Sequence, residues 1–261
     1  MRAFLAFRRF FALKMGMVLA VEYWDGPKGI SATIGLAAVL AASRGLAARP
    51  ALAILFVAAV ARIGKTFPFT INHHYLEALF LAVLALAGRP DVPTAIRAIM
   101  QMTGAVWLYA GLQKVVHGAF VTGETFALYA LFDQHHRLTP SLRWLAGLGG
   151  ALPPLEKAPA ARWTESTVAL SPASALILRA SATAVVAGET LSAALLVPRV
   201  TRPFAAAALL AIQVVLVAVT GEIDIAITST AGLLLFFPRA APRAYLFLLI
   251  ATLLVYLAWW G

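Results

Sequence analysis

The chain contains no cysteine among its 261 residues, and it has few charged residues. Without thiols it can form no disulfide bond, use no thiolate nucleophile and ligate no metal through sulfur. Charged residues make up 12% of the sequence and hydrophobic residues 62%, and the mean hydropathy is +0.87. This composition is typical of polytopic membrane proteins, and it leaves no stretch polar enough for a separate soluble domain of useful size.

Acidic residues are also scarce, since 11 Asp and Glu stand against 21 Lys and Arg, for a formal net charge of +10. No basic stripe interleaved with aromatic residues is present, so we predict no nucleic-acid partner. The arginines instead come in pairs in four short connections, which the positive-inside rule places on the cytoplasmic face. We therefore expect a lipid bilayer as partner, in a bacterial inner membrane. The four connections are residues 44–49, 89–97, 199–202 and 239–243.

Apolar runs recur along the whole chain and predict an all-α fold. They indicate a polytopic integral membrane bundle of about eight transmembrane helices, although several runs are shorter than the roughly 20 residues of a full crossing. Most runs begin or end where proline stands next to arginine, which combines a helix stop with a cation that prefers lipid headgroups. The runs are 30–47, 50–63, 72–88, 95–117, 173–197, 203–220, 223–238 and 243–260.

We predict one membrane domain, residues 1–261, in which two segments differ from the apolar runs. Residues 1–27 place Arg8, Arg9 and Lys14 among apolar residues, as an amphipathic interfacial helix or a ninth span does. Residues 118–171 are rich in proline, glycine and acidic residues. They predict a long extramembrane loop, which is a candidate lid.

Lys114 is the first candidate for chemistry, because it lies in an otherwise apolar run that ends at Gly118. An amine inside a bilayer must be paired, neutral or next to a water-filled cavity. Small residues after Tyr109 permit close helix packing, which would desolvate the amine and leave it able to accept a proton. The alternative is a lysine that reaches the membrane surface along its own stem, three residues before His117.

A second cluster opens an earlier run with His73, His74, Tyr75 and Glu77. His73 and Glu77 are four residues apart and share a helix face, where the carboxylate can fix the tautomer of the imidazole. The alternative is that the two histidines and the tyrosine simply lie at the headgroup boundary. Alternating spans place this cluster and Lys114 on the same face of the membrane, which we expect to be periplasmic.

Glu189 lies in the middle of another apolar run, so it must be protonated or paired. The candidate partners are Arg179 on the same helix or a group on a neighbouring helix. The alternative role of Glu189 is a structural hydrogen bond between helices.

Metal binding is the remaining chemistry that the residue types allow. All five histidines and two acidic residues are expected on one side, and they offer enough nitrogen and oxygen ligands for zinc or iron. Their spacing matches no metal signature, and adjacent histidines on a helix point about 100° apart. We therefore predict no metal site. The residues concerned are His73, His74, His117, Glu124, Asp133, His135 and His136.

Three short segments carry a family likeness. They are Asn72-His73-His74-Tyr75-Leu76 at a helix start, Tyr109–Gly118 (YAGLQKVVHG) followed by Gly123-Glu124, and Gly188–Arg199 (GETLSAALLVPR). In order and spacing they resemble the membrane domain of the vitamin K-dependent γ-glutamyl carboxylases and their bacterial HTTM-type relatives. The family motifs are Asn-His-x-Tyr-Leu, an aromatic-x-Gly-x-x-Lys-Leu stretch, and a later helix that ends in a basic turn.

The resemblance implies an enzyme that couples the oxygenation of reduced vitamin K or menaquinol by O2 to proton abstraction, with CO2 addition to a glutamyl substrate as a further step. Lys114 would be the base, and Asn72 and His73 would hydrogen-bond the oxygenated intermediate or the substrate, which would be a peptide or protein. The residues expected to bind substrate or cofactor are His74, Tyr75, Glu77, Tyr109, His117 and Glu189. The likeness bears on quinol and base chemistry more strongly than on carboxylation.

Two other functions stay open at the level of sequence. The first is a non-catalytic, DoxX-like membrane subunit that binds quinone or a partner protein. The second, a small transporter, is less supported, because no pair of interrupted helices recurs in corresponding halves of the chain.

Overall fold

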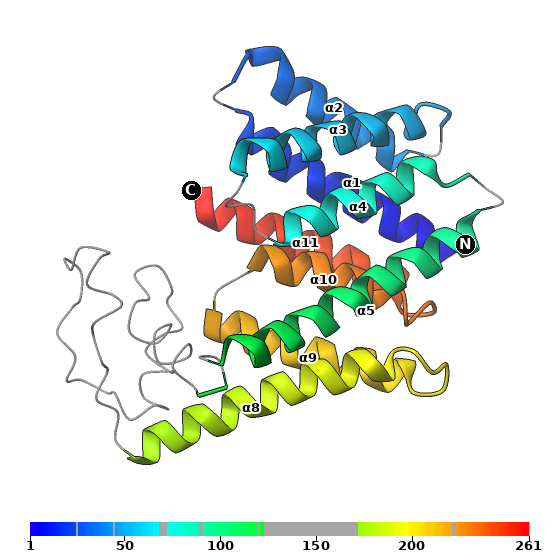
Figure 1. The fold of residues 1–261 in the computed structure, drawn as a ribbon. Helices are drawn as coiled ribbons and strands as arrows, with labels where there is room; N and C mark the ends of the chain where they lie inside the picture. The colour runs from blue at the N-terminus through cyan, green and yellow to red at the C-terminus, as the bar shows by residue number, and fades with distance from the viewer. Residues whose placement is uncertain are drawn as a thin grey trace, which may run out of the picture. The chain divides into compact units, whose positions relative to one another are not determined.

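The structure is a computed structural model that describes residues 1–24, 26–43, 45–67, 72–88, 91–118, 121–122, 172–220 and 223–260. All regular secondary structure in these ranges is α-helical (Figure 1). Nearly all of the predicted lid lies outside them. The described helices are α1 (Arg2–Glu22), α2 (Lys28–Ala42), α3 (Ala48–Thr66), α4 (Asn72–Leu86), α5 (Val92–His117), α8 (Pro172–Leu195), α9 (Arg202–Thr220), α10 (Ile223–Leu234) and α11 (Ala241–Trp260).

Helices form where the apolar runs are, but the prediction of about eight membrane-spanning helices is wrong. Within the described residues one helix segment, Ala175–Leu195, is long and apolar enough to cross a membrane. α2 and α4 have 15 residues each and α10 has 12. At a rise of about 1.5 Å per residue these helices extend about 18–22 Å, short of the roughly 30 Å of a hydrocarbon core. These helices are shorter than the apolar runs in the sequence because the runs also include residues of the connecting turns.

The chain divides into two compact units. The first unit consists of Met1–Val106 and Ile227–Gly261, and the second of Trp107–Ala226. The boundary between the two units falls inside α5 and inside α10, so each of these two helices has residues in both units.

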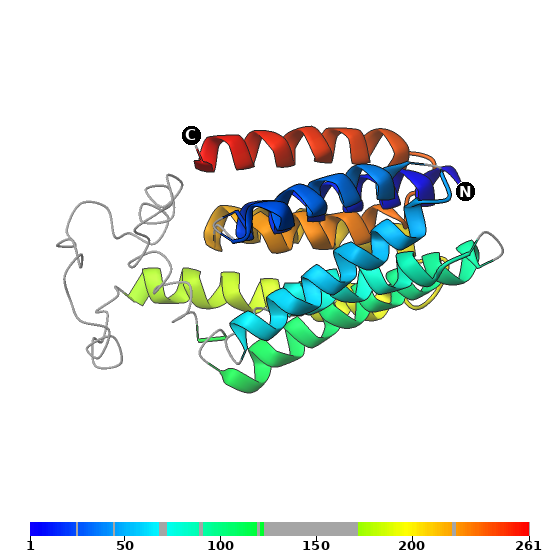
Figure 2. The same ribbon diagram turned by 90° about the horizontal axis from the view of Figure 1, so that it is seen from above.

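The first unit is built around α1. This helix packs against α2, α3, α4 and α11, and Figures 1 and 2 both show it among them. A continuous buried stripe runs along α1 and includes Phe7, Phe11, Lys14 and Val18 at helical spacing. α1 thus lies inside its unit, and whether residues 1–27 form the expected interfacial helix or a ninth span stays a prediction.

Aromatic rings fill the middle of the first unit. The rings of Phe7 and Phe11 stack at 5.5 Å between centroids, and the ring of Phe80 on α4 meets both edge-on. Tyr245 on α11 meets Phe7 edge-on at 5.8 Å, and its hydroxyl donates to the Ala231 carbonyl of α10 over 2.7 Å. Each such ring pair adds about 0.5–1.5 kcal/mol beyond the burial of its area. The rings thus join α1, α4, α10 and α11.

The second unit contains the α8–α9 hairpin and the C-terminal part of α5. Ala182, Val185 and Val186 of α8 form a small apolar core, against which Ile212 of α9 packs. Gly188 lies where the same isoleucine side chain comes close to the α8 backbone. Glu189, the next residue, is fully buried.

Candidate functional site

A buried ion pair joins α1 to α4 in the first unit. The ammonium group of Lys14 contacts Oε1 of Glu77, and both residues are fully buried. Thr228 on α10 donates its hydroxyl to the same oxygen over 2.9 Å and accepts a hydrogen bond from Lys14 Nζ over 3.1 Å. Burying two charges costs several kcal/mol per ion unless further hydrogen bonds satisfy them, and the threonine supplies such bonds. Three helices thus meet at one carboxylate.

Arg62 on α3 extends this pair into a network of four charges. Its Nη1 lies 3.1 Å from Oε2 of Glu77, and its Nε lies 2.6 Å from Oε2 of Glu22 at the end of α1. Lys14 and Arg62 balance the two glutamates, so the formal charges sum to zero. We call the buried part of this group, formed by Lys14, Arg62 and Glu77 together with Thr228, the Glu77 network.

Tyr23 lies beside this network, directly after α1. Its hydroxyl donates to the Ala58 carbonyl over 3.3 Å, and the ammonium of Lys65 lies 4.2 Å from the centre of its ring. Burial and then the neighbouring Glu22 carboxylate raise the pKa of the Tyr23 hydroxyl, while Arg62 acts in the opposite direction. Tyr23 is therefore neutral at physiological pH and serves as a hydrogen-bond donor.

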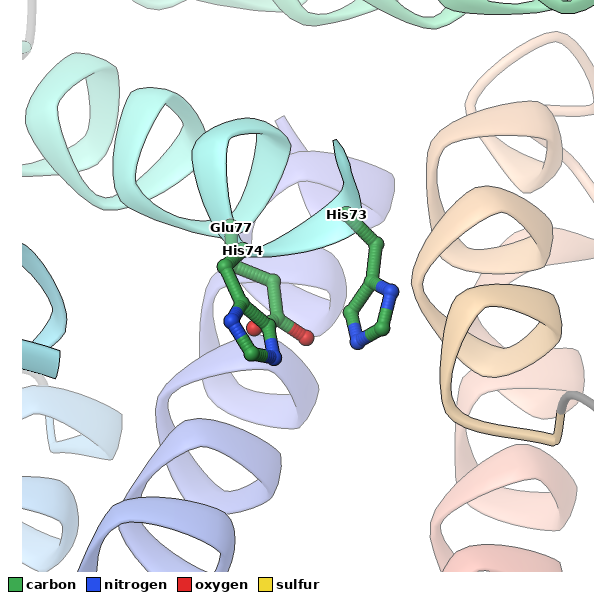
Figure 3. Close-up of side chains that lie close together, drawn as sticks. All are labelled: His73, His74 and Glu77. Carbon is green, nitrogen blue, oxygen red and sulfur yellow. The ribbon is translucent and has the colours of Figure 1, made fainter. Parts of the chain in front are cut away.

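Two imidazoles flank the Glu77 carboxylate in the first turns of α4 (Figure 3). The rings of His73 and His74 lie 4.5 Å apart between centroids at an interplanar angle of 82°, and both residues are buried. One ligand atom from each histidine and from Glu77 all lie within 4.8 Å of one another. The proximity of His73 and Glu77 predicted from their spacing is confirmed, and the divergence of adjacent helical positions does not keep the two rings apart.

Lys114 and Glu189 form a second ion pair, between α5 and α8 in the second unit. The ammonium of Lys114 contacts Oε1 of Glu189, which is fully buried, whereas the lysine side chain is 22% exposed. The partner of Glu189 is thus on a neighbouring helix, and it is not Arg179. Within the described part of the chain, Oε2 of Glu189 is buried and accepts no hydrogen bond. That Lys114 and His73 lie on the same face of a membrane stays a prediction, because they belong to different units.

Gly111 brings the backbones of α5 and α8 together beside this second pair. A Cβ atom on Gly111 would overlap Oγ1 of Thr190 and lie 3.2 Å from its backbone nitrogen and 3.4 Å from its Cα. Rotation of the threonine side chain would move Oγ1 but not the two backbone atoms, so the tight contact with the backbone nitrogen would remain. The prediction that small residues near Lys114 permit close helix packing is confirmed.

Substituting Gly111 with alanine is expected to lower the free energy of unfolding by about 1–3 kcal/mol, because the two helices must separate to admit the methyl group. Gly64→Ala is the matched control. Gly64 is also in a helix, but a Cβ there would have nothing within 4 Å, so the variant should be as stable as the parent or up to about 1 kcal/mol more stable. Thermal unfolding followed by circular dichroism compares the two. Equal melting temperatures would contradict the close contact.

The other sequence candidates are less closely involved in these clusters. Tyr75 and Tyr109 are exposed, so neither is part of a buried site in its own unit. The remaining candidates have side chains outside the described part of the chain, and their predicted roles stay predictions. They are Asn72, His117, Glu124, Asp133, His135 and His136.

Three residues of the Glu77 network were not among the sequence candidates. Lys14 follows Phe7 by seven positions and Phe11 by three, so helical spacing alone places it on the buried stripe of α1. Arg62 likewise belongs to the buried stripe of α3. Thr228 has no comparable sequence signal, since a threonine in an apolar helix is common and its partners are far away in the sequence.

Comparison of the chain with protein-family models, with curated proteins and with solved structures found no match. The likeness to the vitamin K-dependent carboxylases therefore depends on the three short motifs alone.

Proposed function

We propose that this protein is a hydroquinone-oxidising enzyme related to the vitamin K-dependent carboxylases, in which the Lys114–Glu189 pair takes a proton from the hydroquinone. The overall reaction would convert a naphthohydroquinone, such as reduced vitamin K or menaquinol, and O2 into the quinone epoxide and water. Addition of CO2 to a glutamyl substrate is the further step that the family likeness would bring. The roles of Asn72 and His73 toward the oxygenated intermediate belong to the same proposal.

One observation carries the proposal, namely the unmet hydrogen-bonding capacity of Glu189. Its Oε1 accepts from Lys114, while its Oε2 is buried and has no donor among the described residues. Leaving a buried acceptor without a donor costs about 1–3 kcal/mol, and more for a charged group. A phenolic O–H bound at this oxygen would remove that cost, and it would place the acidic proton against a carboxylate.

The ion pair has the acid–base capacity that this step needs. As an ammonium–carboxylate pair it can accept one further proton on Glu189, after which the lysine remains as a positive charge beside the phenolate. A phenolate in apolar surroundings needs such a counter-charge, because burial otherwise disfavours the ionised form. The apolar core formed by Ala182, Val185 and Val186 lies along the same helix.

The experiment that tests the function is direct. Purified protein is incubated with reduced menaquinone or reduced vitamin K under O2, and the epoxide is separated by chromatography and identified by mass. Protein-dependent epoxide formation is the expected result, and Lys65→Met, which removes an exposed ammonium in the first unit, should leave the rate unchanged. Absence of the epoxide with both hydroquinones would favour a non-catalytic quinone-binding subunit.

A lipid environment accompanies this proposal, because charged groups are buried among the helices while large apolar side chains are exposed. The buried groups include the Glu77 network and Glu189, whereas large apolar side chains on several helices are exposed. In water such faces would be expected to associate with other molecules, and lipid is the occupant that fits a chain of formal charge +10. Among the exposed side chains are Leu36, Val39, Val57, Val60, Leu191, Phe204, Val214, Phe247, Ile250 and Leu254.

We expect the protein to remain in the membrane pellet when membranes from expressing cells are washed with alkaline carbonate, since apolar contacts with lipid are not weakened by high pH. Glutamate at both Phe247 and Leu254, on the exposed face of α11, should increase the fraction released. Immunoblots of pellet and supernatant provide the measurement. Complete release of the parent protein would contradict the lipid environment and leave the hydroquinone reaction to be judged by its own assay.

A further inference from the structure

We propose that His73, His74 and Glu77 bind one divalent transition-metal ion, at a site that shares His73 with the proposed hydroquinone reaction and is tested without it. Figure 3 shows the two imidazole rings on either side of the carboxylate. One ligand atom from each residue lies within 4.8 Å of the others, and all three residues are buried at the start of one helix. Two imidazole nitrogens and a carboxylate oxygen gathered in this way are a ligand set that can hold one metal ion.

The ligand types determine the class of ion. Imidazole nitrogen suits zinc, iron, nickel and copper, whereas calcium and magnesium take oxygen ligands. Two histidines and one carboxylate are a set found with catalytic zinc and with non-haem iron(II), in which the remaining positions are open to water or another ligand. Metal–ligand bonds of about 2.1 Å place ligands about 3.4 Å apart in a tetrahedron. Closing the triad from 4.8 Å thus requires movements of about 1 Å, which side-chain rotation supplies.

The surroundings of Glu77 hold its carboxylate in a fixed orientation, as the outer partners of a metal-binding carboxylate do. Oε1 accepts hydrogen bonds from Lys14 and Thr228, and Oε2 accepts one from Arg62. A carboxylate has about four lone-pair positions, so one position on Oε2 stays open among the described residues. The metal would bind there, on the side of the carboxylate that the histidines flank.

If a metal ion binds here, the charge of Lys14 should weaken its binding, an effect that a cluster with a purely structural role would not show. Its ammonium and a bound cation would both lie next to the Glu77 carboxylate, and like charges a few ångströms apart in a buried site repel strongly. Replacing Lys14 with methionine keeps the length and apolar stem of the side chain and removes the charge. Glu77 keeps Arg62 and Thr228 as partners in this variant. Metal affinity should therefore rise by about tenfold or more.

The test uses the full chain, freed of metal with a chelator, and titrates it with zinc(II) in competition with a chromophoric chelator. Anaerobic iron(II) is titrated in the same way. We expect one ion per chain with a dissociation constant in the micromolar range or tighter, tighter binding in Lys14→Met, and loss of at least tenfold in affinity in His74→Ala and in Glu77→Gln. Cobalt(II) absorption spectra of the parent protein report the number and type of ligands without any substitution.

The results separate the proposal from its alternatives. Failure of the parent protein to bind zinc(II), iron(II) and cobalt(II) would overturn it. Binding that His74→Ala leaves unchanged would also overturn it, because the ion would then occupy another place on the chain. Where a variant melts well below the parent, the cobalt(II) spectrum of the parent decides, and a spectrum without nitrogen ligation would count against the site. None of these results depends on whether the protein oxidises a hydroquinone.

Discussion

Glu77→Ala is expected to reduce the free energy of unfolding by about 3–5 kcal/mol. The substitution leaves the ammonium of Lys14 fully buried without its carboxylate, and Arg62 keeps only the Glu22 partner at the end of α1. An uncompensated buried charge is far more costly than the loss of a surface ion pair, which is worth about 0–1 kcal/mol. Unfolding by denaturant, followed by circular dichroism in the lipid or detergent used for purification, measures the loss.

A second substitution distinguishes this explanation from a general loss of packing. In the double variant Glu77→Met, Lys14→Met both charges of the central pair are removed and replaced by side chains of similar volume. Most of the lost stability should return, because a buried ion pair is often replaceable by apolar groups at little cost. The coupling energy between the two positions should therefore be large. If the double variant were less stable than Glu77→Ala, the electrostatic explanation would be wrong.

Lys114→Met is expected to reduce hydroquinone oxidation by about 10²–10⁴-fold, the range that a positioned acid–base group contributes. The substitution removes the positive charge beside Glu189 and leaves that carboxylate buried alone, so the phenolate would lose its counter-charge. The measurement is the rate of epoxide formation at saturating hydroquinone, together with the melting temperature of each variant. A rate equal to that of the parent protein would contradict the proposed role.

Exchanging the two residues separates chemistry from structure at this ion pair. The double variant Lys114→Glu, Glu189→Lys preserves an ammonium–carboxylate pair between α5 and α8, so it should recover most of the stability that Lys114→Met loses. It should not recover the rate. An ammonium at position 189 has no acceptor to offer a phenolic hydroxyl, whereas the carboxylate of Glu189 has one. Recovery of both stability and rate would mean that the pair is only a link between helices.

The two buried ion pairs also show how much of the candidate site could be predicted from the sequence. Glu189 had to be paired or protonated, since it lies in an apolar run, and a neighbouring helix was one of its two possible sources of a partner. The spacing of His73 and Glu77 placed them on one helix face. The sequence did not indicate that Lys114 is that partner, because a lysine in an apolar run is equally compatible with a side chain that reaches the membrane surface.

Lys14 is the clearest case in which tertiary structure changed the interpretation. Its spacing from Phe7 and Phe11 was visible, yet a lysine near two arginines in an N-terminal segment is also typical of an interfacial helix. The Glu77 network joins residues 15, 63 and 151 positions apart along the chain. Pairing over such distances depends on how whole helices pack, which local spacing does not specify.

The sequence by itself determined where most of the described helices lie, because the apolar runs and the proline–arginine breaks are local properties of the chain. It also determined that chemistry must depend on histidine, lysine and glutamate, since the chain has no cysteine. Only the tertiary structure decided which charges meet, how short several helices are, and that α1 lies within the first unit. These properties follow from contacts between distant segments. Which cations pair with a buried carboxylate depends on how the helices pack and on the free-energy cost of burying a charge without a partner.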